Sequence, residues 1–316
     1  MDIQYLLFLQ DFRNGYGGFL APFLLWASDF AISFWLIAAM CMIYWAWDRK
    51  GGKLLLFGFY IGILFNGFLK LVFCVYRPWI RDPRIIPYGN SIVTATGYSF
   101  PSGHSTCATT ILGGLGIWLK RKGLLLPACV AWLGVFIVMF SRNYLGVHTP
   151  QDVTIGFLSS LLAIYLAGKI EDWTDADAKR DVLLIVAGIV LCIALALFYQ
   201  YKPYPLDYLA NGKLLVDPER MKPDSFQGLG CIIGYVIARY FERRGFDFEQ
   251  ALSFKTRLII GLVALVPLGL FLNYCAPVLK PFVGNLGGQF IKFFMLSIYV
   301  MNIVPWVMQL VHRYKQ

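Results

Sequence analysis

The segment from Ser141 to Asp152 is a polar and ionisable island between two long apolar runs. His148 and Asp152 are four positions apart, which on a helix is about 40° around the axis, so both lie on one face. A carboxylate there can accept the Nδ1 proton of the imidazole and leave Nε2 free as a nucleophile or base. Arg142 would face elsewhere on an unbroken helix, so we expect a turn at Gly146 to bring it back. A guanidinium beside an activated histidine indicates a phosphate ester as substrate.

A second motif consists of two basic residues, Lys70 and Arg77, at the end of another apolar run. They are nearly two helical turns apart and share a face, and Pro78 then stops the helix. Taken alone, such cations are also typical of side chains that reach from the end of a span to the membrane surface. Their combination with the other motifs favours phosphate binding.

The third motif, Pro101-Ser102-Gly103-His104, opens another apolar segment. Ser102 suits a helix N-cap, and the free amides of Ser102 and Gly103 at the helix start suit phosphate oxygens. His104 is placed to protonate a leaving oxygen and later to activate water. Two of the three histidines therefore lie in these motifs, and the third, His312, is interpreted as a surface residue.

The remaining polar residues give no sign of a metal or another cofactor. No carboxylate, histidine or cysteine cluster with metal-ligand spacing lies near the motifs, so the sequence predicts chemistry without a metal. The seven cysteines form no C-x-x-C pair and lie mostly inside apolar runs, which favours packing roles. The net charge of +10 comes from basic residues scattered over short loops, a pattern that fits orientation in a bilayer rather than nucleic-acid binding.

The elements that must position the motifs are membrane-spanning helices. Hydrophobic residues make up 58% of the 316 residues and charged residues 15%, and many apolar runs approach the ~20 residues that cross a bilayer. The expected spans are 30–47, 54–75, 103–119, 124–141, 153–171, 182–201, 225–241, 258–276 and 288–311. The N-terminus lacks the features of a cleaved signal peptide. Residues 3–29 mix apolar residues with Asp11, Arg13, several glycines and Asp29, so we expect interfacial helices before the first span, or else one tilted span over 18–47.

These elements predict an all-α integral membrane protein in four parts. Interfacial helices occupy residues 1–29, a six-helix catalytic core 30–201, an extramembrane loop 202–224, and a C-terminal extension of about three transmembrane helices 225–316. With alternating spans, all three motifs meet at one membrane face. Of the 28 lysines and arginines, sixteen fall on the membrane face away from the motifs, and nine fall on the face of the motifs when Lys70, Arg77 and Arg142 are set aside. Because basic residues gather on the cytoplasmic side, the site is expected on the periplasmic, extracellular or lumenal side and the C-terminus in the cytoplasm.

The motifs resemble those of the type-2 phosphatidic acid phosphatase superfamily, the lipid phosphate phosphatases that share a core with vanadium haloperoxidases. Lys70 and Arg77-Pro78 fit its K-x6-R-P motif, residues 101–104 fit P-S-G-H, and residues 141–152 fit S-R-x5-H-x3-D. The resemblance covers about residues 30–201. It implies His148 as nucleophile, Asp152 as its partner and His104 as acid and base. The phosphate ligands that it implies are Lys70, Arg77, Ser102, Gly103 and Arg142.

The expected activity is metal-independent hydrolysis of a lipid phosphate or diphosphate through a phosphohistidine. The three spans after residue 224 are similar in number to those of the sphingosine-1-phosphate phosphatase branch and, more loosely, of glucose-6-phosphatase, which favours a sphingoid-base phosphate. Polyprenyl diphosphate, phosphatidylglycerophosphate and phosphatidate are the alternatives. Arg81 and Arg84 fit either a second phosphate or anionic lipid headgroups.

Two functions of other classes share the same residues. A phosphotransferase would pass the phosphoryl group to an acceptor other than water, and a lipid transporter would use the cations for binding but would not need the pair of His148 and Asp152. The expected partners are a lipid phosphate and membrane lipids, with no nucleic acid. The sequence indicates neither an oligomeric state nor a role for the C-terminal helices.

Overall fold

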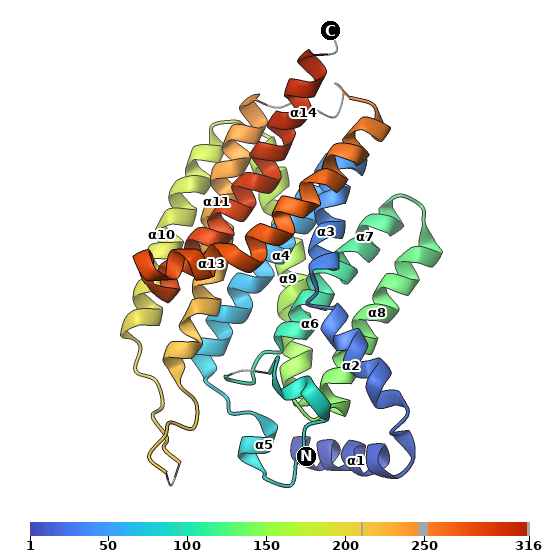
Figure 1. Cartoon of the computed structure of the whole chain (residues 1–316), viewed down its shortest axis with the longest axis vertical. Coiled ribbons are helices and arrows are strands. Elements are labelled where there is room, and N and C mark those ends of the chain that lie inside the picture. The colour runs from blue at the N-terminus through green and yellow to red at the C-terminus, as the bar shows by residue number, and fades with distance from the viewer. Residues whose placement is uncertain (96, 210, 246–251, 315–316) are drawn as a thin grey trace. The chain divides into compact units, whose positions relative to one another are not determined.

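Helices make up nearly all the regular structure of this chain (Figure 1). The computed structural model describes residues 1–95, 97–209, 211–245 and 252–314, and within them the extended pairing is limited to a bridge between Tyr208 and Leu214. In chain order the helices are α1 (Asp2–Phe12), η1 (Arg13–Gly17), α2 (Leu20–Phe30), α3 (Phe34–Met42), η2 (Ile43–Trp47), α4 (Arg49–Phe73), α5 (Pro78–Arg81), η3 (Gly89–Ile92), α6 (Gly103–Ala108), η4 (Thr109–Gly113), α7 (Gly114–Arg121), α8 (Leu125–Tyr144), α9 (Pro150–Asp175), α10 (Arg180–Tyr201), η5 (Pro218–Arg220), α11 (Lys222–Gly245), α13 (Phe254–Ile298), η6 (Tyr299–Ile303) and α14 (Val304–Arg313).

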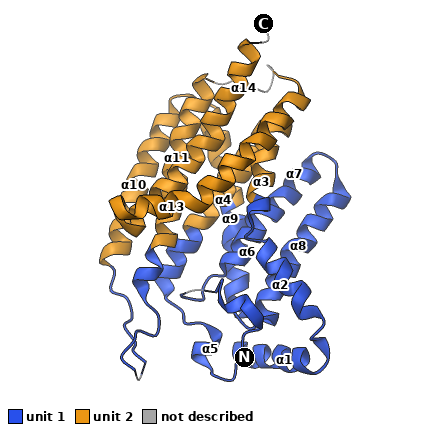
Figure 2. Ribbon diagram, viewed as in Figure 1, with its two compact units in different colours: residues 1–36, 65–163, 202–222 blue, residues 37–64, 164–201, 223–316 orange. Residues whose placement is uncertain are grey.

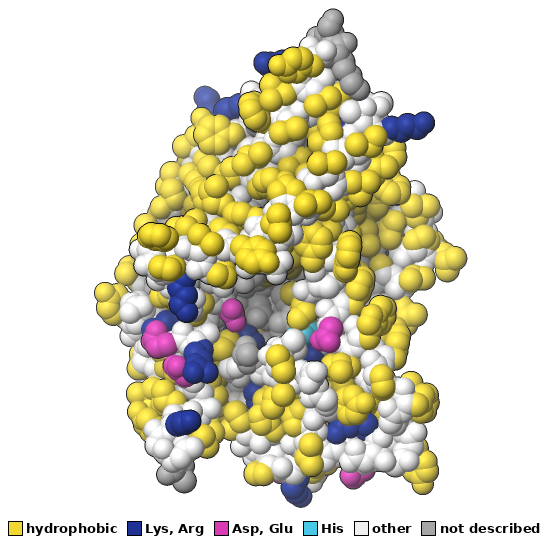
Figure 3. Space-filling view, viewed as in Figure 1, with side chains coloured by type: hydrophobic (Ala, Val, Ile, Leu, Met, Phe, Trp, Pro, Cys, Tyr) yellow, Lys and Arg dark blue, Asp and Glu magenta, His cyan; other side chains and the backbone are white. Residues whose placement is uncertain are grey.

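Several of these helices are long and apolar enough to cross a membrane. Within the described residues there are five, and a sixth if the pair of α2 and α3, bent by 48°, is one broken span. Their outer faces are apolar: α10 exposes Val182, Val186 and Val190, and hydrophobic side chains cover most of the visible surface over α10, α11 and α13 (Figure 3). Since such a surface is stable only against lipid, the prediction of an all-α integral membrane protein is confirmed.

The helices differ in detail from the nine expected spans. The candidate over Phe254–Arg313 contains two of them, because the helix is broken at Gly284, whose φ of 71° is not helical. The expected span over 103–119 is built from α6, the π-helical segment η4 and α7. The expected span over 225–241 lies in α11, which carries several charged residues. The helix α2 begins at Leu20, so the helical run extends further toward the N-terminus than residue 30.

The chain divides into two compact units (Figure 2). Unit 1 contains residues 1–36, 65–163 and 202–222, and unit 2 contains residues 37–64, 164–201 and 223–316. Each unit is assembled from segments far apart in the sequence. All the residues of the three motifs fall in unit 1.

In unit 1, the loop after α10 caps the helix that carries the first motif. The ammonium group of Lys202 donates to the carbonyls of Leu71 and Val72, in the last turn of α4, and it lies over the ring of Tyr204. These carbonyls have no partner within the helix, and a cation at a helix C-terminus also meets the negative end of the helix dipole. The cap therefore fixes the end of α4 from which Lys70 projects.

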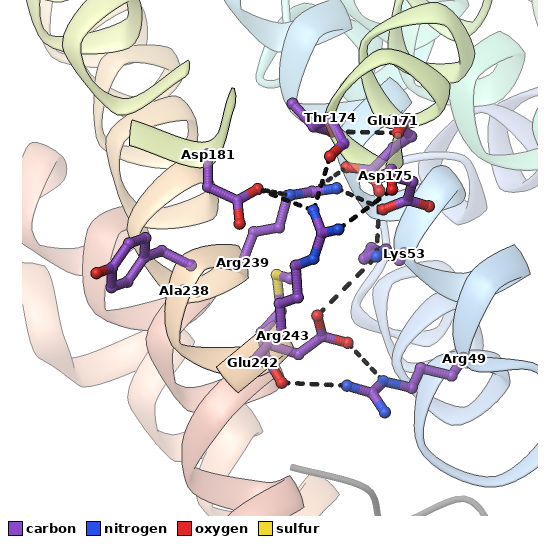
Figure 4. Close-up of polar contacts among 12 residues, drawn as sticks. Arg49, Lys53, Glu171, Thr174, Asp175, Asp181, Ala238, Arg239, Glu242 and Arg243 are labelled. Atoms are coloured by element: carbon purple, nitrogen blue, oxygen red, sulfur yellow. Dashed lines mark hydrogen bonds and ion pairs between the residues drawn. The ribbon is translucent and has the colours of Figure 1, made fainter. Parts of the chain in front are cut away.

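Unit 2 holds a cluster of buried charges at the ends of four helices (Figure 4). Arg239 on α11 is fully buried, and its guanidinium pairs with Glu171 at 2.9 Å, Asp175 at 2.6 Å and Asp181. Glu171 and Asp175 come from α9 and Asp181 from α10. The guanidinium thus joins three helices through one side chain.

The same cluster reaches the start of α4. Arg49 pairs with Glu242 at 2.5 Å, and Lys53 pairs with Glu171 at 3.1 Å. Cations at a helix start and carboxylates at a helix end both oppose the helix dipole, so these residues do not stabilise their own helices. Their partners lie on other helices, which indicates that the cluster stabilises the packing of α4, α9, α10 and α11.

Arg239→Ala should lower the free energy of unfolding by about 3 kcal/mol, because the buried carboxylates of Glu171 and Asp181 lose their most deeply buried cation, although Lys53 and Arg244 remain beside them. The measurement is thermal or chemical unfolding of purified protein in one detergent. Arg220→Ala is the matched control, because Arg220 is exposed and its contact with Asp217 is long, at 3.5 Å. Equal stability of the two variants would contradict the structural role of the cluster.

Candidate active site

The predicted pair of His148 and Asp152 lies where α8 passes into α9. The helix α8 ends at Tyr144, and Asp152 lies in the first turn of α9. Gly146 has a φ of 75°, which a side chain would disfavour, and the chain reverses there as expected. The amide of His148 then donates to the carbonyl of Arg142 at 3.2 Å. The turn therefore brings His148 next to Arg142, which would lie on another face if the helix continued unbroken.

A single oxygen of Asp152 receives three donors. Its Oδ2 lies 3.3 Å from His148 Nδ1, accepts the amide of Thr149 at 2.8 Å, and accepts the hydroxyl of Ser99 at 2.5 Å. All four residues are buried. Two hydrogen bonds therefore fix the orientation of the carboxylate. One comes from Thr149 at the start of α9, and the other comes from Ser99, in the segment before the third motif.

The protonation of His148 follows from its other ring nitrogen. Nη1 of Arg77 lies 2.8 Å from His148 Nε2. A guanidinium only donates, so Nε2 must accept with its lone pair, and the ring proton must be on Nδ1, facing Asp152. This is the tautomer that a nucleophile at Nε2 requires.

Burial lowers the pKa of His148 well below its ordinary value of 6.5, and the positive charges of Arg77, Arg142 and Lys70 lower it further. Both effects disfavour an imidazolium, because it would be a charge away from water and next to other cations. His148 is therefore a neutral imidazole near pH 7, with its Nε2 lone pair available.

The two cations of the first motif reach the same loop segments. Lys70 donates from Nζ to the carbonyls of Tyr98 at 3.2 Å and Pro101 at 3.1 Å. Arg77 donates to the carbonyls of Gly97 and Val147, each at 3.1 Å. Both cations are buried.

The start of α6 completes this group. Ser102 is the N-cap, as expected, and its hydroxyl accepts the amide of Ser105 at 3.3 Å. The Ser102 amide donates to the carbonyl of Asp152 at 3.0 Å, which ties α6 directly to the start of α9. A side chain at Gly156 would meet the Ser102 carbonyl at 2.9 Å, so the two helices approach with no side chain between them.

Three nitrogens of the expected site residues are buried and have no hydrogen-bond partner in the part of the chain that the structure describes. They are His104 Nε2 and the Nε and Nη2 atoms of Arg142. Buried polar atoms are nearly always paired, so unpaired ones at a site call for a ligand or an ion. An anion with several oxygens would satisfy all three, which fits the predicted phosphate.

Arg81 and Arg84 make other contacts. Arg81 pairs with Asp2 at 2.7 Å and Arg84 with Asp82 at 2.7 Å, and the side chain of Arg84 is 72% exposed. The hydrogen bond from Arg84 lowers the pKa of Asp82 to about 2. The side-chain contacts of the two arginines go to Asp2 and Asp82 and not to the residues of the three motifs, so a role in binding a headgroup stays a prediction.

The sequence did not point to three polar residues that contact this group. Ser99 holds Asp152, and Ser28 on α2 accepts Nη1 of Arg142 at 2.5 Å. Asn66 donates to the carbonyl of Pro101 at 3.4 Å and to the Thr106 hydroxyl at 3.0 Å. Asn66 had a visible signal, since it is a polar residue one turn before Lys70 in an apolar helix. Ser99 and Ser28 had none, because their partners are 53 and 114 residues away.

The described residues contain no group of three or more histidine, cysteine, aspartate or glutamate side chains that could hold a metal ion. Metal-free chemistry stays a prediction that only an experiment can test.

Comparison with known proteins adds a family. Residues 51–176 match the model of the PAP2 superfamily. The chain is 28% identical over 148 residues to the undecaprenyl-diphosphatase of Sulfolobus acidocaldarius, a match that covers 43% of this chain and 63% of that protein. It is 31% identical over 148 residues to phosphatidylglycerophosphatase B of Bacillus subtilis strain 168, with 44% of this chain and 67% of that protein covered. The match thus spans less than two thirds of the first relative, and no solved structure matches.

Ser99→Ala should lower kcat for phosphate release about tenfold, because a hydrogen bond to the buried Asp152 carboxylate is lost. The control is Ser159→Ala, since the hydroxyl of Ser159 donates to the carbonyl of Gly156 in its own helix, α9. If both variants turn over at the parent's rate, Ser99 has no part in orienting the carboxylate.

The pH dependence should report the low pKa of His148. Because the imidazole is protonated only well below 6.5, the loss of kcat/KM that it causes on acidification should lie below that pH. Lys70→Gln removes one of the charges that lower this pKa, so it should move the loss to higher pH. Rates across pH on one substrate, with the exposed Lys213→Gln as control, would show this, and an unmoved profile would contradict it.

Proposed function

The chain belongs to the PAP2 superfamily, and from that membership and the geometry of the site we propose that it is a phosphatase acting on a phosphate or diphosphate of a membrane lipid. One observation carries the proposal most directly. The neutral imidazole of His148 lies between the Asp152 carboxylate and the Arg77 guanidinium, next to buried nitrogens that lack partners.

In the first step, His148 Nε2 attacks phosphorus and the bond from phosphorus to the leaving oxygen breaks. His104, as an imidazolium beside the bound anionic phosphate, gives its proton to that oxygen and becomes neutral, so the lipid leaves as an alcohol or, from a diphosphate, as a monophosphate. The imidazole becomes positively charged while it keeps its Nδ1 proton, and Asp152 stabilises that charge. Lys70, Arg77, Arg142 and the Gly103 amide at the start of α6 hold the phosphoryl oxygens, whereas the Ser102 amide, expected to be free, is occupied by the carbonyl of Asp152.

In the second step, water attacks the phosphohistidine on the side opposite the imidazole. His104 takes a proton from the water, the bond between phosphorus and Nε2 breaks, and inorganic phosphate leaves. His148 returns to its neutral form with the proton on Nδ1. Three buried cations take the place that a metal ion has in many phosphoryl-transfer sites, so the reaction needs none.

The substrate is a lipid, because the site residues lie in a unit whose helices continue into membrane spans. The relatives are named for undecaprenyl diphosphate and phosphatidylglycerophosphate, which ranks these two classes first. A sphingoid-base phosphate, favoured by the count of C-terminal helices alone, ranks after them. The distribution of basic residues supports a site on the periplasmic, extracellular or lumenal side with the C-terminus in the cytoplasm.

The decisive experiment measures phosphate release by purified protein in detergent with EDTA. The substrates are undecaprenyl diphosphate, phosphatidylglycerophosphate, phosphatidate and sphingosine-1-phosphate. His148→Ala should release no phosphate from any of them, and Asp152→Asn should release it at least tenfold more slowly than the parent. With radiolabelled substrate, an acid-labile phosphoprotein should form in the parent and be absent in His148→Ala.

Each outcome has one meaning. Release by His148→Ala at the parent's rate would contradict the nucleophile, and release abolished by EDTA and restored by magnesium would contradict the metal-free reaction. Label that appears on an added lipid alcohol instead of in free phosphate would identify a phosphotransferase. Folded parent protein that binds these lipids without releasing phosphate would indicate a transporter.

A further inference from the structure

The guanidinium of Arg142 is held by a residue from outside the matched family segment. Arg142 is fully buried near the end of α8, and its Nη1 donates to the hydroxyl oxygen of Ser28 at 2.5 Å. Ser28 is also fully buried, and it lies on α2, before residue 51, where the family match begins. The family motifs therefore specify the arginine but not the group that orients it.

The remaining donors of Arg142 show what this contact achieves. Nε and Nη2 are buried without a partner, whereas Nη1 is occupied by Ser28. A guanidinium is a rigid planar fork, so fixing Nη1 fixes the direction of the other two donors. Adjacent Nε and Nη2 atoms form the edge that binds two oxygens of a phosphate at once.

The partner on α2 is neutral, and this matters for binding. A carboxylate in the place of Ser28 would cancel the charge of Arg142 and compete with a phosphate for its donors. A hydroxyl accepts one N–H bond without doing either. Asp29, the next residue, is exposed.

The segment that carries Ser28 is firmly attached to the end of α8. Arg13 donates to the carbonyl of Tyr144 at 2.8 Å, and the Tyr144 hydroxyl donates to the carbonyl of Gly17 at 2.5 Å. A side chain at Gly17 would collide with that hydroxyl. Leu9, Ala21, Leu24 and Tyr144 form one buried apolar cluster. The residues before 31 thus pack on the last turn of α8, where Arg142 lies.

We propose that Ser28 is a positioning residue for phosphate binding, and that the N-terminal segment is part of the active site rather than only a membrane anchor. Ser28 holds Nη1 of Arg142 so that Nε and Nη2 face the phosphoryl oxygens. The inference rests on the proposed function, because it assigns Arg142 to the phosphate of that reaction.

The test uses the full-length chain and two measurements. Orthovanadate, which takes the geometry of a phosphoryl group in transfer, is titrated by calorimetry, and KM and kcat are measured with the best of the four lipids. Ser28→Ala should weaken vanadate binding about tenfold and raise KM by a similar factor, with kcat changed less than threefold. The matched control is Ser33→Ala, which removes a buried hydroxyl that has no partner and should change neither quantity.

A double-mutant cycle separates positioning from a general structural role. In the Arg142→Ala background, Ser28→Ala should cause no further loss, because Ser28 acts through the guanidinium. Additive losses, or vanadate affinity and KM within twofold of Ser33→Ala, would overturn the proposal. Ser28→Cys, which is close in size but a weak acceptor, must show the same loss if the alanine variant does not fold.

The vanadate titration also distinguishes this inference from the proposed function. Parent protein that binds vanadate but releases no phosphate from any lipid would refute the phosphatase and leave the role of Ser28 to be decided by the titration. Parent protein that binds no vanadate would overturn the inference itself.

Discussion

Much of the structure follows from the need to keep three cations close together in a buried place while leaving their charge available. Like charges repel strongly away from water, and the usual solution is to pair each cation with a carboxylate. Lys70 and Arg77 donate to backbone carbonyls, and Arg142 donates to a hydroxyl. Neutral acceptors satisfy these N–H donors and leave the positive charge in place, as the proposed binding of a phosphate requires. The irregular loops that supply those carbonyls are therefore as much a part of the site as the motifs.

Unit 2 shows the opposite arrangement with the same residue types. Arg239 is as deeply buried as Arg142, but three carboxylates surround it. Its charge is cancelled within the protein, and every strong contact joins one helix to another. The kind of partner thus distinguishes a cation that binds a ligand from one that holds helices together, where burial alone does not.

The sequence predicted the parts of this protein that depend on short spacing. The pairing of His148 with Asp152, the turn at Gly146 and the N-cap at Ser102 follow from positions a few residues apart, and the structure contains all three. The alternation of spans predicts that the motifs lie at one membrane face, and in the structure all of them fall in unit 1.

The parts that the sequence did not predict depend on contacts between distant segments. Ser28 and Ser99 are ordinary serines until the fold places them beside Arg142 and Asp152. The break at Gly284 was not expected in detail either, because glycines are common in apolar helices and only the backbone angle reveals which one interrupts the helix. Hydropathy likewise could not show that the expected spans 258–276 and 288–311 belong to one helical run, Phe254–Arg313, that is interrupted at Gly284.

The contact between Arg77 and His148 has a consequence for selectivity. In the proposed reaction, the lone pair that attacks phosphorus is the same lone pair that accepts the Arg77 N–H at 2.8 Å. A phosphate oxygen is a stronger acceptor than an imidazole, so an anionic substrate draws the guanidinium to itself and in doing so uncovers the nucleophile. A neutral ester offers no such oxygen, and the nitrogen stays covered. The negative charge of the substrate thus exposes Nε2 of His148. While no anion is bound, the Arg77 contact protects this nitrogen from uncharged electrophiles in the membrane.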